Sequence, residues 1–217
     1  MVKGISYRSR LNPDRHFLLQ HIHFDKSISR AEGHYLYDTE GEAYLDFLAQ
    51  YGAVPFGHNP PLVWETLHRL RSNREPSLVQ PLLSPAAEEL SDRLSAIAPC
   101  RNGYVTFTNS GAETVEAAIK LARAKTSNPY IVSASGGFHG KTLGAVSATW
   151  NPKYRDPFLA DTCHFDFVPY GNIEALDARL AKGDVAAFLV EPVQGEAGIP
   201  PAICARPQSY VTNTAAC

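Results

Sequence analysis

The pattern of apolar and polar positions divides the chain into a first stretch of short elements and a second stretch of regular alternation. Aromatic and aliphatic residues alternate within Gly33 to Phe47 on both sides of a turn at residues 38–41, which predicts a β-hairpin. Apolar residues at helical spacing predict a helix from Leu62 to Leu70. A further helix is expected to begin with Ser84 as its N-cap and Pro85 at its first helical position.

From residue 104 onward, β-rich runs alternate with helical segments, which is typical of a parallel sheet covered by helices. The run VAAFLV is apolar throughout, so we expect this strand to be buried on both faces of the sheet. The pattern therefore predicts an α/β fold. The expected strands are Tyr104 to Thr108, Tyr130 to Ala134 and Val185 to Val190, and the expected helices are Ala112 to Lys125 and Ile173 to Leu180, with a helical or turn segment from Lys141.

The last stretch, residues 199–217, breaks this alternation. It contains one charged residue, Arg206, and has neither helical nor strand periodicity. Because a surface segment usually carries more charge, we expect this tail to be foreign to the fold and the sheet to be incomplete.

Composition and charge exclude several classes of partner. A formal net charge of −2 offers no cationic surface for nucleic acid or an anionic membrane. No apolar run has the length of a signal peptide or of a spanning helix, so we expect a cytoplasmic protein without a membrane partner. The cysteines form no CxxC pair, and the alternating His21, His23 and Asp25 have no further ligand nearby, so no metal site is expected.

Candidate chemistry follows the strand ends, where open parallel sheets bind their ligands. After the first expected strand, Ser110 and Glu113 form an S-x-x-E capping box beside small residues, which leaves backbone N–H groups free to bind an anion such as phosphate. An ordinary capped helix has the same signature and is, for this motif alone, the commoner explanation.

Two further strand ends have the same character. Glycines on both sides of Phe138, within residues 136–142, allow a sharp turn that presents the flat ring to a planar ligand. The alternative is a core phenylalanine in a tight turn. Glu191 directly follows an apolar strand, where a carboxylate needs a polar partner. The alternative for Glu191 is a solvent-facing loop acid.

In this order and spacing, over about Arg30 to Ile199, the three motifs resemble those of the class III aminotransferases, which have the fold-type I architecture. The resemblance implies pyridoxal 5'-phosphate as cofactor, a small-molecule amine and a 2-oxo acid as substrates, and a homodimer for the complete protein. It implies that a Ser-Gly-Ala turn holds the cofactor phosphate, that an aromatic residue stacks on the pyridine ring and that a glutamate lies near the phenolic oxygen. The implied cofactor-binding residues are Ser110, Gly111, Ala112, Phe138, His139 and Glu191.

Two further matches and one departure concern the substrate. Tyr51 stands where ornithine-type members carry a tyrosine that contacts the far amino group, and Glu196 is similar to the glutamate that pairs with a carboxylate-binding arginine. Lys141 replaces an arginine that binds the substrate carboxylate in ornithine-type enzymes. Its ammonium group is a point charge, whereas an arginine can form two parallel hydrogen bonds to a carboxylate. The resemblance therefore implies transamination of an ω-amino or ornithine-like donor. Specificity for 4-aminobutyrate, acetylornithine or a diamine is the alternative.

The family also places an aspartate on the pyridine nitrogen and, further along the chain, a Schiff-base lysine. Neither has a counterpart in this sequence, so the catalytic residues are unknown. We expect the chain to be truncated before the lysine and inactive by itself. A catalytically dead fragment that acts only as a binding partner is the alternative to an enzyme.

The pattern and the resemblance together predict three parts. Residues 1–60 form an N-terminal segment with the hairpin and belong to the small domain. Residues 61–198 form an incomplete large domain that binds the cofactor, with a mostly parallel sheet and helices on both faces. Residues 199–217 form the aberrant tail.

Overall fold

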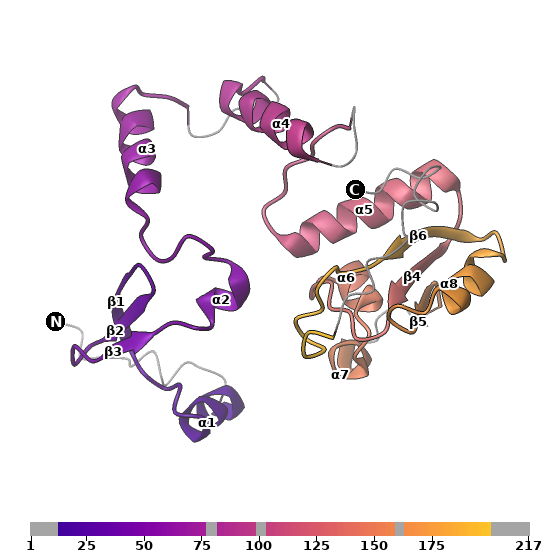
Figure 1. Ribbon diagram of the computed structural model, residues 1–217, viewed down its shortest axis with the longest axis horizontal. Coiled ribbons are helices and arrows are strands. Elements are labelled where there is room, and N and C mark those ends of the chain that lie inside the picture. The colour runs from indigo at the N-terminus through magenta and orange to yellow at the C-terminus, as the bar shows by residue number, and fades with distance from the viewer. Residues whose placement is uncertain (1–12, 77–81, 99–102, 159–162, 201–217) are drawn as a thin grey trace. The chain divides into compact units, whose positions relative to one another are not determined.

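The structure, a computed structural model, describes residues 13–76, 82–98, 103–158 and 163–200. The chain forms two compact units, residues 1–82 and 83–217 (Figure 1). In the described ranges no helix is both long enough and apolar enough to cross a membrane. The three-part division inferred from the sequence stays a prediction, and most of its tail, residues 201–217, lies outside the described ranges.

A small antiparallel sheet of order β1-β2-β3 organises the N-terminal unit. The predicted hairpin is confirmed, because β2 pairs with β3. Its turn is held by Asp38, whose Oδ1 accepts the N–H groups of Glu40 and Glu42, both at 2.9 Å. The sequence reading missed α1 and β1. The elements of this unit are α1 (Pro13–His21), β1 (Ile28–Glu32), β2 (Tyr35–Asp38), β3 (Ala43–Leu45), α2 (Ala49–Gly52) and α3 (Pro61–Ser72).

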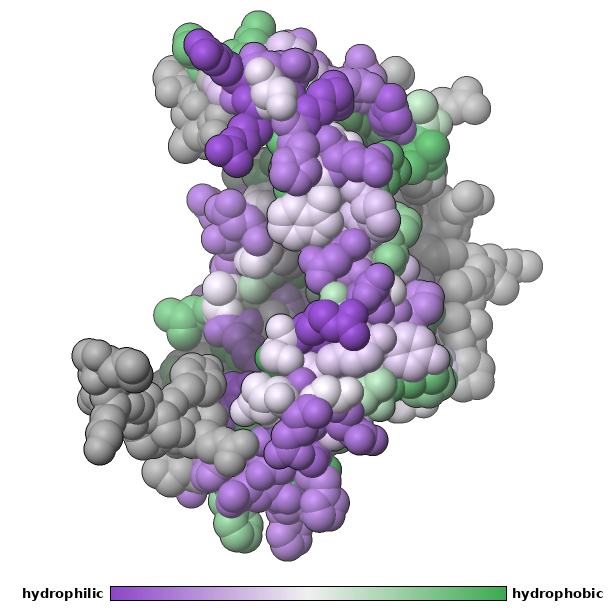
Figure 2. All heavy atoms as spheres, turned by 90° about the vertical axis from the view of Figure 1, so that its left-hand side faces the viewer, coloured by the Kyte–Doolittle hydropathy of each residue, from purple (hydrophilic) through white to green (hydrophobic). Residues whose placement is uncertain are grey.

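The N-terminal unit leaves much of its apolar surface exposed. Among its described residues only Asp38 is buried. Figure 2 shows a surface on which polar and apolar side chains are mixed. This unit therefore has no closed hydrophobic core within its described residues. Its most exposed large side chains are Phe47, Tyr51, Phe56 and Leu62.

A parallel sheet of order β5-β4-β6 organises the second unit. The helices expected at Ala112 to Lys125 and Ile173 to Leu180 are confirmed within one residue at each end. The helix expected from Pro85 begins there, and a helix begins at Leu143 within the segment from Lys141. The predicted N-cap Ser84 precedes α4, although its side chain makes no capping hydrogen bond. The elements are α4 (Pro85–Ile97), α5 (Gly111–Thr126), β4 (Tyr130–Ala134), α6 (Leu143–Ala148), α7 (Pro152–Arg155), the 3-10 helix η2 (Asp156–Phe158), β5 (Phe165–Val168), α8 (Ile173–Leu180) and β6 (Val185–Leu189).

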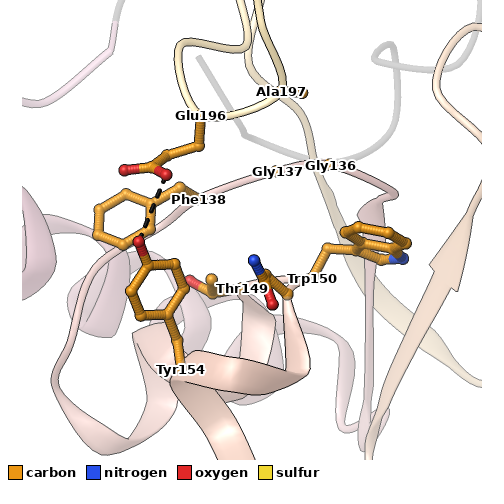
Figure 3. A pocket seen from close by; sticks show the side chains of 9 residues that line it. Gly136, Gly137, Phe138, Thr149, Trp150, Tyr154, Glu196 and Ala197 are labelled. Atoms are coloured by element: carbon orange, nitrogen blue, oxygen red, sulfur yellow. Dashed lines mark hydrogen bonds between the residues drawn. The ribbon is translucent and has the colours of Figure 1, made fainter.

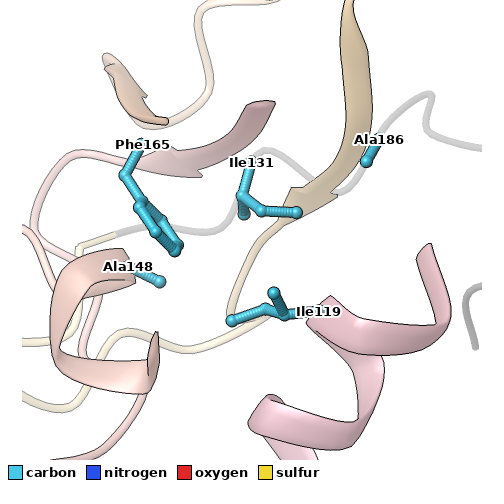
Figure 4. Close-up of a cluster of buried hydrophobic side chains, with 5 residues drawn as sticks. All are labelled: Ile119, Ile131, Ala148, Phe165 and Ala186. Carbon is cyan, nitrogen blue, oxygen red and sulfur yellow. The ribbon is translucent and has the colours of Figure 1, made fainter. Parts of the chain in front are cut away.

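The central strand β4 forms the core of this unit. Its side chains alternate between the two faces of the sheet, so Ile131 and Val132 enter different hydrophobic clusters. Ile131 meets residues of α5 and α6 on one face (Figure 4). Val132 packs with Leu176 of α8 on the other face. The sheet therefore has helices on both faces, as the sequence predicts.

Two strand predictions need correction. Residues 104–108 form no strand, because no neighbouring strand pairs with them in the described ranges, and Tyr104 is fully exposed. The last strand, β6, is not buried on both faces, because it lies at the edge of the described sheet and only Ala186 is buried. The strand that is buried almost throughout is β4. The sequence reading did not identify β5.

A buried arginine ties α8 to the sheet. Arg179 donates to Asp166 of β5 and to Asp184, which precedes β6, each at 2.6 Å. Burial alone would lower the pKa of Arg179, but the hydrogen bonds to the two carboxylates outweigh it and raise that pKa. The charge network therefore stabilises the packing of α8 against β5 and β6.

Candidate active site at the carboxyl edge of the sheet

The N-terminus of α5 supplies the first part of the site. Half of the predicted capping box is formed, since Ser110 Oγ accepts the N–H of Glu113 at 3.2 Å, whereas Glu113 Oε2 accepts the N–H of Asn109 at 2.6 Å instead of the N–H of Ser110. Gly111 and Ala112 occupy the first helical positions, where backbone N–H groups have no acceptor within the helix. These N–H groups and the helix dipole together suit an anion.

The turn after β4 supplies the second part. Gly136 has a φ of 84°, a region that glycine adopts without strain, and the chain reverses there. The end of α6 holds the turn, because Thr149 Oγ1 accepts the N–H of His139 at 3.0 Å and the N–H of Trp150 donates to the carbonyl of Gly137 at 2.9 Å. Phe138 is thereby carried on a rigid turn.

A close approach of two small residues joins these two parts. A Cβ placed on Gly140 would lie 2.7 Å from the Cβ of Ala112, so only glycine allows this contact. Gly140 also has a φ of 129°, which side chains rarely tolerate. The first turn of α5 and the turn that carries Phe138 therefore lie directly against each other.

Glu191, which follows β6, is the third part of the site, and a hydrogen bond joins it to the turn after β4. Its Oε1 accepts the backbone N–H of Phe138 at 2.8 Å. Burial raises the pKa of Glu191, the hydrogen bond from Phe138 opposes this shift, and the charge of Glu196 adds to it. The carboxyl group of Glu191 is therefore easier to protonate than an ordinary glutamate.

Gln194 is a site residue that the sequence reading missed. Its side chain is 1% exposed, and its Nε2 donates to the carbonyl of Ser135 at 3.0 Å. A Cβ on Gly136 would meet its Oε1 at 2.8 Å. Gln194 therefore fastens the loop after β6 to the turn after β4. No local pattern signals this role, because the partner lies 59 residues away.

Glu196, Phe138 and Tyr154 of α7 line a small hollow, in which the Tyr154 hydroxyl points toward Glu196 beside the Phe138 ring (Figure 3). The Tyr154 ring meets the Phe138 ring edge-on at 5.5 Å, and its hydroxyl donates to Glu196 Oε2 at 3.4 Å. Lys141 Nζ lies 5.8 Å from the centre of the Tyr154 ring. Lys141 and Glu196 are therefore linked through Tyr154, which the sequence reading did not single out.

The hollow is smaller than a ligand pocket. Its volume is about 80 Å³, whereas ligand pockets measure roughly 300–1,000 Å³. Neither Ser110 nor Glu191 lines it. The hollow is thus a recess beside Phe138. The three motifs are brought together by the close approach of Gly140 to Ala112 and by the hydrogen bond between Phe138 and Glu191.

Two predicted site residues have a different setting. His139 is packed behind Gly137, where burial lowers its pKa, and its Nε2 has no hydrogen-bond partner among the described residues. A neutral imidazole suits this position. Tyr51 belongs to the N-terminal unit and is 90% exposed.

The backbone around Tyr51 is unusual. Ala49, Gln50 and Tyr51 have φ values of 45°, 53° and 58°, a left-handed turn that costs about 1–2 kcal/mol per residue. Asp46 supports this turn, because its Oδ1 accepts the N–H of Ala49 at 2.9 Å and its Oδ2 lies 2.8 Å from His58 Nε2. The strain is thus held by a local network within this unit.

Metal chemistry receives no support from side-chain geometry. Within residues 13–76, 82–98, 103–158 and 163–200, no three His, Cys, Asp or Glu side chains converge as metal ligands would.

Comparison with known proteins decides the family. Residues 20–212 match the family model described as Aminotransferase class-III. The chain belongs to the class-III aminotransferase family. It is 39% identical over 194 residues to Aminotransferase PigE of Serratia sp., covering 89% of this chain and 23% of PigE. It is 38% identical over 186 residues to the acetylornithine aminotransferase of Methanopyrus kandleri, covering 86% of this chain and 47% of that enzyme.

Solved structures of related enzymes agree with the fold. An ornithine aminotransferase from Toxoplasma gondii, with partial occupancy of pyridoxal phosphate at its active site, has a TM-score of 0.73 and 25% identity over 91% of this chain and 50% of that chain. The taurine:2-oxoglutarate aminotransferase from Bifidobacterium kashiwanohense, in complex with pyridoxal phosphate and glutamate, has a TM-score of 0.72 and 26% identity over 82% of this chain and 45% of that chain. These similarities confirm the predicted fold-type I architecture. The class-III chain described here spans about half the length of these structures.

Proposed function

We propose that this chain supplies the cofactor seat of a pyridoxal-phosphate-dependent transaminase that moves an amino group from an ω-amino or ornithine-like donor to a 2-oxo acid. The observation that carries the proposal is the hydrogen bond from Phe138 to Glu191, which brings two strand ends together beside the N-terminus of α5. Membership of the class-III family supports the same reaction.

The residues at this edge fit the chemical groups of pyridoxal phosphate. The first N–H groups of α5, at Gly111 and Ala112, would bind the phosphate with the hydroxyl of Ser110. Phe138 would stack on the pyridine ring, where offset stacking contributes about 0.5–1.5 kcal/mol beyond burial. Glu191 would lie near the phenolic oxygen, where its raised pKa makes its carboxyl group easier to protonate than that of an ordinary glutamate.

When bound, pyridoxal phosphate supplies a ring that withdraws electrons from the carbon beside the amino nitrogen. The residues of this chain orient that ring and exclude water from one side of it. The capping box keeps the first N–H groups of α5 directed outward, and Thr149 with Glu191 keeps the turn of Phe138 rigid. Preorganised groups of this kind need no rearrangement when charge develops.

The proposal for the donor rests on charged groups beside Phe138. Lys141 would attract a carboxylate as a point charge, with less directional preference than an arginine. Glu196 would bind a positively charged group. The left-handed turn that exposes Tyr51 supports a role in contacting the far amino group. Donors such as 4-aminobutyrate, acetylornithine or a diamine fit the same charges, and the similarity to an acetylornithine aminotransferase favours the second of these.

Titration of the purified chain with pyridoxal phosphate tests the cofactor seat. We expect saturable binding in visible absorbance, competition by inorganic phosphate, and about fivefold weaker binding after Phe138→Leu because stacking is lost. Phe158→Leu is the matched control, since Phe158 is 67% exposed and lies outside the turn. The absence of saturable binding to the wild-type chain would refute the proposed seat.

Borohydride reduction separates an enzyme from a catalytically dead binding fragment. A cofactor adduct trapped at one specific lysine would contradict the inactive fragment, whereas scattered labelling of surface lysines would favour it. Sedimentation at several protein concentrations tests the expected homodimer. A single monomeric species at all concentrations would contradict that expectation for this chain.

A further inference from the structure

Glu116 of α5 binds the segment that follows the Phe138 turn. Its Oε1 accepts the backbone N–H groups of Gly144 at 2.8 Å and Ala145 at 3.1 Å, in the first turn of α6. Thr142, the N-cap of α6, also acts on the same carboxylate, because its side chain lowers the pKa of Glu116. One side chain of α5 therefore satisfies the start of a helix that lies 28 residues further along the chain.

The contact is close on both sides. A Cβ on Gly144 would overlap the Glu116 carboxylate, so an alanine at this position would force that carboxylate to move. Burial would raise the pKa of Glu116, but the hydrogen bonds from Thr142, Ala145 and Gly144 outweigh it and lower that pKa. Glu116 is therefore a carboxylate at neutral pH.

The contact repeats a spacing already present at the site. Ala112 and Glu116 are four residues apart, so they lie on one face of α5 on successive turns. Their partners, Gly140 and Gly144, are also four residues apart. Two close contacts, one apolar and one charged, thus hold one face of α5 against residues 140–144.

We infer that Glu116 is a positioning residue of the cofactor site, which sets the spacing between the N-terminus of α5 and the turn that carries Phe138 and Lys141. The inference rests on the proposed function. Glu116 reaches neither the ring nor the phosphate by itself. It acts through α6, whose first turn it holds and whose far end holds His139 through Thr149.

The role separates two kinds of ligand. Inorganic phosphate occupies only the N-terminus of α5, whereas pyridoxal phosphate must reach both that N-terminus and Phe138. A change in the spacing should therefore weaken the binding of pyridoxal phosphate and leave the binding of inorganic phosphate unchanged. If Glu116 served only to stabilise the fold, its replacement would weaken the binding of both ligands together or the binding of neither.

The experiment measures the dissociation constant of pyridoxal phosphate and the inhibition constant of inorganic phosphate as its competitor. Glu116→Ala is expected to weaken the binding of pyridoxal phosphate about tenfold, because hydrogen bonds to a charged group are lost. The same change is expected to alter the binding of inorganic phosphate less than about twofold. Glu116→Gln should restore most of the affinity, since its amide oxygen still accepts both N–H groups. Glu174→Ala, at an exposed position in the first turn of α8, is the matched control.

A double-mutant cycle with Gly144→Ala tests the contact itself. Gly144→Ala should weaken pyridoxal phosphate in the wild-type background and have little further effect with Glu116→Ala, because the methyl group then meets no carboxylate. Unchanged cofactor affinity in Glu116→Ala, parallel losses for both ligands, or additive effects in the cycle would overturn the inference. A wild-type chain that binds no pyridoxal phosphate would instead overturn the proposed function and the inference with it.

Discussion

The backbone N–H of Phe138 donates to Oε1 of Glu191 across 2.8 Å, although 53 residues separate the two positions in the chain. Parallel pairing explains this contact, because β4 and β6 lie side by side and their carboxyl ends reach the same edge of the sheet. Burial raises the pKa of Glu191 even though this hydrogen bond opposes the shift, so the carboxyl group should make stability depend on pH.

Glu191→Gln should change how stability depends on pH. A carboxyl group whose pKa is raised on folding contributes stability that is fully present below its unfolded value, here 4.5, and is lost as pH rises through the folded value. The stability of the wild-type chain relative to Glu191→Gln should therefore fall as pH rises above 4.5. Urea unfolding from pH 4 to 7 measures this. A difference that stays constant over that range would contradict the prediction.

Gly140→Ala should destabilise the chain more than Gly183→Ala. Both glycines have positive φ, but a Cβ on Gly140 would meet Ala112 at 2.7 Å, whereas one on Gly183 would meet nothing within 4 Å. Backbone strain of about 1 kcal/mol applies to both, and overpacking adds about 1–3 kcal/mol at Gly140 only. Chemical denaturation of the two variants gives the comparison. Equal losses would show that the approach to Ala112 is not tight.

Arg179→Met should lower the free energy of unfolding by about 1–2 kcal/mol at neutral pH. Truncating a fully buried pair costs about 3–5 kcal/mol, but the Asp166 and Asp184 side chains are 42% and 37% exposed, so solvent screens part of the effect.

The effect of Arg179→Met should also depend on pH. The pKa of Asp184 is lowered by its hydrogen bond to Arg179, so the stability it contributes is present above its unfolded value of 3.8 and is lost as pH falls through the folded value. The difference between variant and wild type should shrink on acidification. Urea unfolding at neutral and acidic pH checks this, and a difference that grows at low pH would speak against it.

Ile131→Ala should cost about 2–5 kcal/mol, because the side chain is fully buried between α5, α6 and both neighbouring strands. Leu121→Ala on α5 is a suitable control, since Leu121 is exposed and its truncation removes little packing. Thermal unfolding monitored by circular dichroism distinguishes the two. Similar melting temperatures for both variants would place the core elsewhere.

Local features of the site could be predicted because their partners lie a few residues away. The capping box needs only Ser110 and Glu113, which a single helical turn brings together. The glycines around Phe138 likewise indicate a turn from sequence alone. By contrast, the partners of Gln194 and Glu116 lie 59 and 28 residues away, and nothing in a local pattern pairs them.

Tyr104 to Thr108 shows the opposite limit. Its composition favours a strand, yet a strand requires a neighbour to accept and donate backbone hydrogen bonds, and none pairs with it in the described ranges. β6 is apolar along its whole length, yet it lies at an edge of the sheet because no described strand pairs with its second side. The apolar content of a segment indicates that it can be buried, but it does not indicate which other segment will cover it.

The amino-acid sequence alone determined the alternation of helices with the strands β4 and β6, the helix cap at Ser110 and the polar ends of those two strands, because each depends on backbone preferences and side chains within a few residues. Only the tertiary structure decided that Glu191 binds the Phe138 turn, that Glu116 holds α6 and that Tyr154 links Lys141 to Glu196. These contacts form between segments far apart in the chain, and the packing of β4 between β5 and β6 is what brings those segments together.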